Sequence, residues 1–332
     1  MTAFKVMTWN VENLFRPKPG ATQVERDRYQ RKLEVLAGTI ARLSPDVVAF
    51  QEVGGEEPLH DLQQALGGTH PHRAVSAFPD RRGIRVAFVT QHAVDEQSDT
   101  VDFPAGPALD INDVTGNGGS EPINRMGRGA LRIRVSKNGL TVDVITAHVK
   151  SKLLSFPRPG GTSFTPRDED ERAQVAGIAL LRRTAEMVTL RMLVNGLMRS
   201  NDRVPVVVLG DFNDVPDAQT SLILNGPTGS TLETSAFHRP DDGDRWRLFN
   251  LAPAIPEARR YSRKHHGRKE LLDQIFASQE FFPLGPDNRR RLPAVDSHVD
   301  FEGQLPSVTD DPSERISAVA PDHAPVTASF EI

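Results

Sequence analysis

The sequence predicts an α/β protein with mixed sheets, in which some neighbouring strands are parallel and others antiparallel. Short apolar runs that suit buried strands recur along the 332 residues, and helical patterns alternate with them near the N-terminus. In mid-chain, strand patterns at 129–136 and 140–149 are joined by Lys137-Asn138-Gly139, a combination typical of a hairpin turn. The alternation of strands with helices, together with the hairpin, favours a mixed sheet over a purely parallel one.

Each element has its own signal. Residues 3–11 alternate between apolar and polar side chains, as a strand does. Residues 24–43 place apolar side chains at helical spacing and end at Ser44-Pro45, because the residue before a proline disfavours helical geometry. Further strands are predicted at 46–53, 83–90, 129–136, 140–149, 204–211, 271–278 and 324–331, and further helices at 57–66 and 169–198.

Three segments predict long loops. Residues 95–128 are rich in Gly, Pro, Asp and Asn, 151–168 are rich in Pro, Gly and Ser, and 225–268 are polar and contain prolines. Long loops in a compact domain are more often functional than not. We expect 151–171 to form a lip over a site, where two side chains either stack on a base or pack the loop on itself, namely Phe156 and Phe164.

Composition narrows the class of protein. The net charge of −4 provides no global attraction to nucleic acid or to an anionic membrane, so any such contact must come from a local patch. The chain has no cysteine, which excludes disulfides and thiolate metal sites. It shows neither an apolar signal-peptide core nor a run of about 18 apolar residues. We therefore expect a cytoplasmic protein without a membrane partner, and the sequence indicates no oligomeric state.

Several predicted strands end on chemically competent side chains. Asn10, Glu52 and His148 each close a strand, and Asp211 closes another in the segment VPVVVLGDFNDVPD. Asn213 follows two residues later, on the same face if the chain stays extended. Ligands of open α/β sheets collect where strands end. Each residue alone is more typical of a solvated loop, so only their recurrence argues for a site.

Two C-terminal segments add an acid and a histidine. Asp273 lies in KELLDQIFAS, where an unpaired buried carboxylate would be costly. Asp322 and His323 stand just before the last predicted strand. A buried aspartate that needs a positive partner and a histidine at a strand entrance suggest an acid–histidine pair. The alternative is that they are unrelated surface residues.

Six ordered motifs resemble the signature set of the endonuclease/exonuclease/phosphatase superfamily, which includes the DNase I-like nucleases. The motifs are TWNVEN, QEV, HVKS, GDFND, LLDQIFAS and PDHAPV, and they extend from residue 8 to residue 326. The resemblance implies a four-layer α-β-β-α sandwich, with two mixed sheets face to face and helices outside. Because residues near both ends must then share one site, it also implies a single domain over residues 1–332.

The resemblance implies a metal site formed by three of these residues. Glu52 corresponds to the principal ligand of Mg²⁺, with Mn²⁺ as the alternative ion. Asn10 would orient Glu52 or contact the metal, and Asp322 would be a further ligand. One or two carboxylates with waters and substrate phosphate are the usual environment of protein-bound Mg²⁺.

The catalytic roles also follow from the resemblance. Asp211 would hold the attacking water, and Asn213 would bond a phosphate oxygen. His323 would act as a base or stabilise charge on the phosphoryl oxygens, with Asp273 fixing its tautomer. His148 would contact phosphate or assist the leaving group.

Arginines are the expected phosphate contacts outside these motifs. Arg128 stands where many family members have an arginine near the phosphate, and Arg125 is the close alternative. Arg85 lies within a predicted strand and is the second substrate-binding candidate, whereas Arg81 and Arg82 suit a solvated loop.

Two basic clusters lie further along the chain. We expect the cluster at 259–269 to be functional because it leads directly to Asp273, and the cluster at 289–291 to be a solvated loop. His265 and His266 lack the spacing of a helical metal pair and suit polar loop positions.

The first functional prediction is a Mg²⁺-dependent phosphoesterase that cleaves phosphodiester bonds, most simply a nuclease. The second is a phosphatase for a small phosphorylated molecule, such as a nucleotide or inositol phosphate, which the net charge and the 6% aromatic content favour. The third is a binding protein that keeps only the fold, but the catalytic set is complete. Sphingomyelin cleavage and abasic-site repair are disfavoured by the missing membrane features and by the positions of the two tyrosines, Tyr29 and Tyr261.

Overall fold

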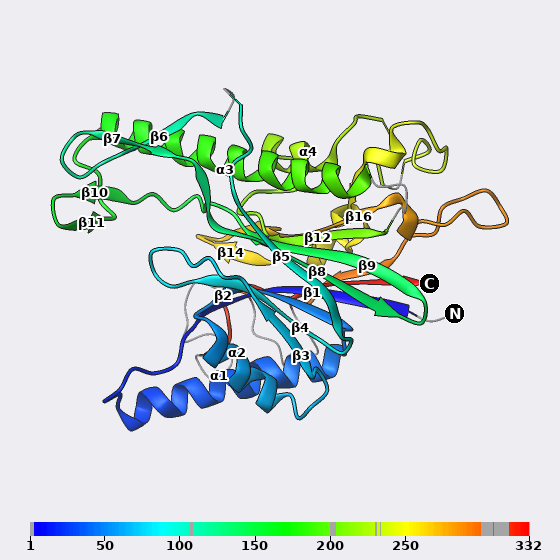
Figure 1. The fold of residues 1–332 in the computed structure, drawn as a ribbon, viewed down its shortest axis with the longest axis horizontal. Helices are drawn as coiled ribbons and strands as arrows, with labels where there is room; N and C mark the ends of the chain where they lie inside the picture. The colour runs from blue at the N-terminus through cyan, green and yellow to red at the C-terminus, as the bar shows by residue number, and fades with distance from the viewer. Residues whose placement is uncertain are drawn as a thin grey trace.

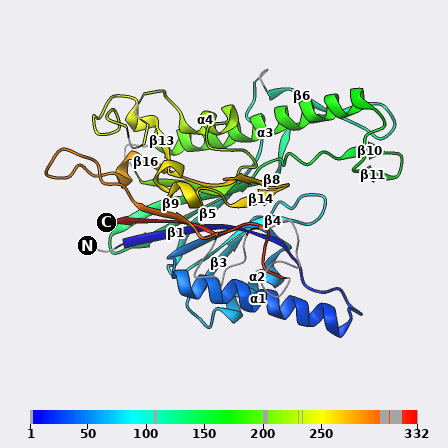
Figure 2. The ribbon, with the colours of Figure 1, turned by 180° about the vertical axis from the view of Figure 1, so that it is seen from behind.

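The computed structural model describes residues 3–106, 109–199, 204–229, 231–232, 234–299, 308 and 319–331. These residues form two six-stranded sheets that pack face to face, with helices on both outer surfaces (Figure 1). The predicted α-β-β-α sandwich is confirmed. Both chain ends lie at one end of the sandwich, and the β10–β11 hairpin (Phe156–Arg158 and Gly161–Ser163) extends at the other (Figure 2).

The first sheet is built around the N-terminal strand. Its order is β17 (Ala294–Ser297), β18 (Val326–Glu331), β1 (Ala3–Leu14), β2 (Val47–Val53), β4 (Arg85–Thr90) and β3 (His72–Val75). Strands β1 and β2 are parallel because α1 (Gln23–Leu43) crosses over between them. This helix and α2 (Glu56–Ala65) cover the outer face (Figure 1).

The second sheet carries the other predicted site residues. Its order is β13 (Leu248–Asn250), β16 (Asp273–Ser278), β12 (Val206–Asp211), β9 (Leu140–His148), β8 (Arg125–Lys137) and β5 (Val94–Asp102). Strands β9 and β12 are parallel, and α3 (Glu169–Met198) connects them across the outer face. The short helix α4 (Gln219–Asn225) lies beside α3 (Figure 1).

Smaller elements decorate the sandwich. Two more hairpins are β6–β7 (Ile111–Val114 and Ser120–Ile123) and β14–β15 (Arg263–His265 and Arg268–Glu270). Single 3-10 turns are η2 (Asp244–Trp246), η3 (Ala252–Ala254), η4 (Glu257–Arg259) and η5 (Gln279–Phe281). None of the helices in the described ranges is both long and apolar enough to cross a membrane.

The central strands are continuous apolar runs in the sequence because their successive side chains point alternately into two buried layers. Val47 and Ala49 of β2 point into the core between the sheets, whereas Val48 and Phe50 pack beneath the helices. A strand buried on both faces has no polar side to show. The same holds for β12, where Val207 faces the central core and the next residue faces α3.

The loop predictions were partly wrong. Residues 95–128 contain most of β5, the whole β6–β7 hairpin and the beginning of β8, residues 125–128. Strand β5 pairs with β8 at the sheet edge and is mostly exposed, so its side chains are polar and its sequence resembles a loop. Likewise, 151–168 contains the β10–β11 hairpin, and 225–268 contains β13 and most of the β14–β15 hairpin.

Candidate active site

The space between the sheets changes from apolar to polar toward one end. The polar side chains at this end are Thr8 and Asn10 of β1, Gln51 of β2, Thr146 and His148 of β9, and Asp211 of β12. All six are buried. Buried polar groups need partners, so this end of the sandwich is held by specific contacts and not by apolar packing alone.

A short hydrogen-bond chain joins the two sheets just below the predicted site. Thr8 Oγ1 donates to Gln51 Oε1 at 3.2 Å, and Gln51 Nε2 donates to Thr146 Oγ1 at 3.0 Å. No role was predicted for these three residues from the sequence. Their signal is alternation, because Thr8 and Thr146 precede Asn10 and His148 by two residues and share their face.

The most buried part of the site is a cluster of two aspartates and a histidine. Asp211, Asp273 and His323 are 1%, 0% and 5% exposed, and one ligand atom of each lies within 4.8 Å of the others. Antiparallel pairing of β12 with β16 places Asp211 opposite Asp273. The predicted acid–histidine pair is present, since His323 Nδ1 lies 2.6 Å from Asp273 Oδ2.

Burial and neighbouring charges set the protonation of this cluster. Burial by itself lowers the pKa of His323, but Asp273, Asp322 and Asp211 outweigh it and raise the pKa to about 10. Burial raises the pKa of Asp211 to about 6, opposed by the positive charge of His323 and assisted by the negative charge of Asp273. His323 is thus a charged donor at neutral pH.

His148 is the opposite case. Its Nε2 lies 3.4 Å from Asp211 Oδ2, and its buried Nδ1 has no hydrogen-bond partner within the described part of the chain. Burial, followed by the positive charges of Arg128 and His323, holds the pKa of His148 well below its usual value. The site therefore contains one neutral and one charged imidazole.

Asn10 links this cluster to Glu52. Its Nδ2 donates to Asp211 Oδ2 at 2.9 Å and approaches Glu52 Oε1 at 3.5 Å. The other carboxylate oxygen of Glu52 accepts the backbone N–H of Asn13 at 3.0 Å. Unlike the aspartates, Glu52 is only half-buried. The structure thus brings together two of the three residues predicted to form the metal site.

Backbone strain concentrates around the same residues. Glu12, Asn13, Glu52 and Asn213 have φ angles of 48°, 56°, 66° and 51°, in the left-handed region that non-glycine residues rarely adopt. Such strain persists only where surrounding contacts impose it, and it is frequent at functional sites. Three of these residues lie one or two positions before the last residue of β1 or β2, where the backbone N–H of Asn13 contacts Glu52.

The chain does not stay extended from Asp211 to Asn213, so the condition under which the two would share a face is not met. The chain turns at Asn213, whose backbone N–H donates to Asp211 Oδ1 at 3.0 Å and whose Nδ2 donates to the carbonyl of Val149 at 3.1 Å. Just before this turn, Gly210 permits the close approach of β12 to β9, because a Cβ atom there would lie 2.1 Å from the carbonyl oxygen of Ala147. Asn213 still lies beside Asp211, but through a turn.

Asp322 is in a different environment from Glu52. Its carboxylate forms an ion pair with Arg263 (Nη2–Oδ2 3.2 Å), and its Oδ1 lies 4.0 Å from His323 Nε2. Its backbone N–H donates to Glu12 at 3.1 Å. Its proposed role as a metal ligand stays a prediction, since the carboxylate already has a cationic partner.

The carboxylate oxygens of Glu52 fit a hard divalent cation. Asn10 turns its Nδ2 toward Glu52, and its Oδ1 accepts the backbone N–H of Glu12 at 3.0 Å, so a contact of Asn10 with the metal stays a prediction. Mg²⁺ and Mn²⁺ prefer carboxylate and carbonyl oxygens, and Mg²⁺ usually retains several waters, which requires access to solvent. The half-buried carboxylate of Glu52 satisfies this condition. The buried triad of Asp211, Asp273 and His323 has ligand-type atoms close together, but two of these atoms already bind each other.

Among the predicted substrate-binding arginines and their alternative, Arg85, Arg128 and Arg125, a described contact with a predicted catalytic residue is made by Arg128. It donates to the carbonyl of His148 at 3.4 Å and pairs with Asp80 at 3.1 Å. Arg125 instead lies over the ring of Phe78. Arg85 donates to the carbonyl of Ser76 at 2.9 Å, and its role in substrate binding stays a prediction.

The part played by α3 was not found from the sequence. Glu186 is 1% exposed, and its carboxylate accepts the backbone N–H groups of Gly127 at 2.9 Å and Lys150 at 2.5 Å. Arg183 donates to the carbonyl of Lys150 at 3.1 Å. These contacts hold the backbone that follows His148. A charged pair three residues apart on the buried side of an amphipathic helix was the available signal.

Two neighbouring segments complete the surroundings of the site. Asp214 bonds Arg183 and Thr220 and lies outside the triad. Phe156 of the predicted lip is 2% exposed and packs, whereas Phe164 is 70% exposed. Packing is therefore the structural role of Phe156, and Phe164 remains available at the surface.

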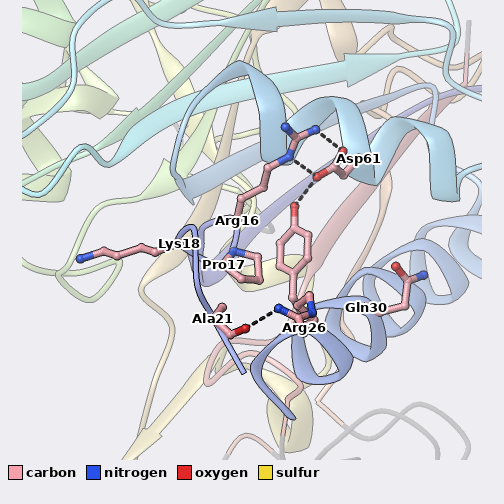
Figure 3. A pocket seen from close by; sticks show the side chains of 8 residues that line it. Arg16, Pro17, Lys18, Ala21, Arg26, Gln30 and Asp61 are labelled. Atoms are coloured by element: carbon pink, nitrogen blue, oxygen red, sulfur yellow. Dashed lines mark hydrogen bonds and ion pairs between the residues drawn. The ribbon is translucent and has the colours of Figure 1, made fainter. Parts of the chain in front are cut away.

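A surface pocket of about 310 Å³ lies between the loop after β1, α1 and α2 (Figure 3). Arg16 forms a two-pronged ion pair with Asp61, both contacts being 2.6 Å, and Tyr29 donates to the same carboxylate at 2.8 Å. These groups satisfy one another, and none of the predicted site residues lines the pocket. We therefore place the candidate active site at the strand ends.

Comparison with known proteins supports the same class. The chain matches the Endonuclease/Exonuclease/phosphatase family over residues 7–307 and belongs to that family. No curated protein sequence matches it. Among solved structures, truncated Caenorhabditis elegans TDP2 is similar, with 16% identity and a TM-score of 0.55 over 99% of this chain and 98% of that chain.

Two bacterial structures show the same fold. The endonuclease/exonuclease/phosphatase from Bacteroides vulgatus has 12% identity and a TM-score of 0.55 over 100% of both chains. Beta toxin from Staphylococcus aureus has 14% identity and a TM-score of 0.52 over 99% of this chain and 100% of that chain. At these identities the likeness concerns the fold alone, and the activity must be argued from the site.

Proposed function

We propose that the protein is a divalent-metal-dependent phosphodiesterase that hydrolyses nucleic acid. The observation that carries this proposal is the continuous set of contacts from the His323–Asp273 pair through Asp211 and Asn10 to Glu52. It combines a charged donor, a carboxylate that can hold water and an oxygen site suited to a hard cation. Phosphoryl transfer needs this combination of positioning and charge stabilisation.

Each residue of the buried half has a defined task in the proposal. Asp211 holds the attacking water and accepts its proton, while Asn213 bonds a non-bridging phosphate oxygen. Asp273 accepts a hydrogen bond from the Nδ1–H group of His323, which leaves the Nε2–H group to donate to the phosphoryl oxygens. His148, neutral and beside Arg128, contacts the phosphate or the leaving oxygen.

Glu52 would hold Mg²⁺ or Mn²⁺, and Asn10, whose Nδ2 approaches Glu52 Oε1 at 3.5 Å, would orient its carboxylate. A cation bound there would supply Lewis-acid stabilisation of negative charge on the phosphate oxygens. Asn10 also bonds Asp211, so it fixes the metal ligands relative to the group that positions water. The identity of the metal remains part of the proposal.

A single domain is also part of this proposal. Trp9 Nε1 donates to the carbonyl of His323 at 2.8 Å, and residues near both ends of the chain contribute to the triad and to the Glu52 site. Separate folding units at the two ends would divide this set of contacts. The cytoplasmic location stays a prediction from the sequence.

The test is a substrate panel assayed with Mg²⁺ or Mn²⁺, with and without chelator. It contains plasmid DNA, single-stranded RNA, bis(p-nitrophenyl) phosphate and phosphomonoesters. Asp211→Ala and His323→Ala are compared with wild type and with Asp27→Ala, an exposed carboxylate of α1. We expect chelator and both site variants to abolish diester hydrolysis while Asp27→Ala retains it.

The panel also separates the alternatives. Identical behaviour of wild type and both site variants on every substrate would contradict the catalytic proposal. Hydrolysis of monoesters alone would support the second candidate, a phosphatase for a small molecule, which the net charge of −4 favours.

A further inference from the structure

The β14–β15 hairpin, residues 263–270, is the most basic protruding element beside the candidate site, and we call it the basic hairpin. Its sequence is RKHHGRKE, and residues 264–269 are all exposed. His266 and Gly267 form its two-residue turn with φ angles of 46° and 75°. Positive φ at both positions is the requirement of the tight turn whose twist matches that of the paired strands.

The basic hairpin is attached directly to the catalytic residues. Arg263 forms an antiparallel bridge with His323. Asp273, the first residue of β16, lies three residues after the end of the hairpin. Ser262 Oγ accepts the backbone N–H of Asp273 at 3.0 Å, and the Ser262 carbonyl accepts the N–H of Ala324 at 2.7 Å. The base of the hairpin is therefore fixed to β16, which begins at Asp273, and to the segment before β18 that carries His323.

Strand register gives the hairpin two different faces. Arg263 pairs with Glu270, and His265 pairs with Arg268, so these four side chains share one face. Lys264 and Lys269 pair with each other and point to the opposite face.

Contacts show which face is turned toward the site. Arg263 reaches Asp322 at 3.2 Å, and Glu270 binds Lys152 at 2.8 Å. Arg268 lies on this same face, farther from the base. On the other face, Lys269 lies over the ring of Tyr261 at 4.5 Å from its centroid.

The charge of the site-facing side is not consumed within the protein. Arg263 is neutralised by Asp322, but Arg268 is exposed and forms no ion pair with any described residue. Within a chain of net charge −4, this guanidinium belongs to a local cluster of positive charge at residues 259–269. Planar guanidinium groups bind phosphate with two parallel hydrogen bonds.

We propose that the site-facing side of the basic hairpin, through Arg268, binds a backbone phosphate of nucleic acid that flanks the bond being cleaved. This inference rests on the proposed function and adds a specific element for substrate recognition. The contact is to the backbone, so it favours long polyanions over small phosphodiesters and carries no base preference. A membrane surface is the less suitable partner, because the turn holds only His266 and Gly267 and offers no apolar anchor.

The first measurement is binding, which does not depend on turnover. Fluorescence anisotropy of a labelled single-stranded DNA is recorded against salt for the Asp211→Asn protein, with Arg268→Gln or Lys264→Gln added. Lys264→Gln is the matched control, because it removes one charge from the same hairpin on the opposite face. We expect Arg268→Gln to weaken binding about fivefold and to reduce the salt slope by about 0.7, and Lys264→Gln to have less than half this effect.

The second measurement is the ratio of kcat/KM for the DNA to kcat/KM for bis(p-nitrophenyl) phosphate. We expect Arg268→Gln to lower this ratio about fivefold through KM. Equal losses on both substrates, or equal effects of the two hairpin variants on DNA binding, would overturn the inference. So would binding to phosphatidylserine vesicles that Arg268→Gln abolishes while DNA binding is unchanged. If wild type hydrolyses no diester, the proposed function fails, whereas the anisotropy result still decides the role of the hairpin.

Discussion

The candidate site has two halves that differ in access to water. Asp211, Asp273 and His323 are at most 5% exposed and are held by regular strand pairing and by one another. Glu52 and Asp322 are partly exposed and stand where regular strand geometry ends. We call these the dry half and the open half.

The difference indicates a division of labour. In the dry half, burial and close charges separate the protonation behaviour of neighbouring groups, as the raised pKa of His323 and the lowered pKa of His148 show. The open half leaves carboxylate oxygens within reach of a hydrated cation. Proton transfer and metal binding are thereby assigned to different residues, and the variants below test this assignment.

The largest effect is expected from removing the charged imidazole of the dry half. His323→Gln should lower kcat for bis(p-nitrophenyl) phosphate by about 10³-fold at saturating metal, because the phosphoryl oxygens lose their cationic donor. The matched control is His60→Gln, an exposed histidine of α2, which should retain wild-type kcat. A folded His323→Gln protein with near wild-type kcat would contradict the role given to the dry half.

Glu52→Gln should act on the open half instead. We expect the metal concentration for half-maximal activity to rise about 10- to 100-fold, with a smaller loss of kcat once metal is saturating. Activity titrated with Mg²⁺ and Mn²⁺ gives both quantities. Glu34→Gln, an exposed glutamate of α1, is the control, and an unchanged metal requirement in Glu52→Gln would argue against the open half as the metal site.

A smaller effect is expected from the contact between α3 and the backbone after His148. Glu186→Gln keeps the size of the side chain but converts one acceptor of the Gly127 and Lys150 N–H groups into a donor. We expect about a tenfold loss of kcat with KM changed less than twofold, because substrate contacts remain while their alignment suffers. Restoration of most activity by Glu186→Asp would support a positioning role. If kcat falls in both Glu186 variants only in proportion to a loss of thermal stability, the role of Glu186 is purely structural.

The smallest effect concerns stability near the dry half. Burial, followed by the charge of Arg182, lowers the pKa of Lys150 to about 8. Above this pKa the folded protein binds fewer protons than the unfolded chain, so its stability should rise with pH until the ordinary lysine pKa is reached. From about pH 8 to about pH 9.5, the free energy of unfolding of wild type should gain about 1 kcal/mol relative to Lys150→Met, allowing for partial exposure. Denaturant unfolding at several pH values measures this gain, and parallel pH profiles would contradict it.

The sequence predicted the residues of the site better than their relations. Asn10, Glu52, His148 and Asp211 could be found because each follows an apolar run, which is a local feature of the sequence. His148 and Asp211 do end β9 and β12, whereas β1 continues past Asn10 to Leu14 and β2 continues to Val53. The pairing of Asp211 with Asp273 depends on the register between β12 and β16, which are separated by more than 60 residues of chain. No local pattern specifies that register.

Other features escaped prediction for equally physical reasons. The turn at Asn213 depends on bonds to Asp211 and Val149, which override the extended preference of the preceding strand. The edge strand β5 reads as a loop because one of its sides faces solvent. The role of Glu186 emerges only when α3 packs on the sheet and its carboxylate meets two unpaired backbone N–H groups.

The division of labour is tested most directly by calorimetric titration of Mn²⁺ into wild type, Glu52→Gln and His323→Gln. This measurement reports metal binding without any turnover. We predict that Glu52→Gln weakens binding at least tenfold, whereas His323→Gln stays within about threefold of wild type. Loss of binding in His323→Gln with retention in Glu52→Gln would contradict the account, because it would place the metal in the buried triad of Asp211, Asp273 and His323.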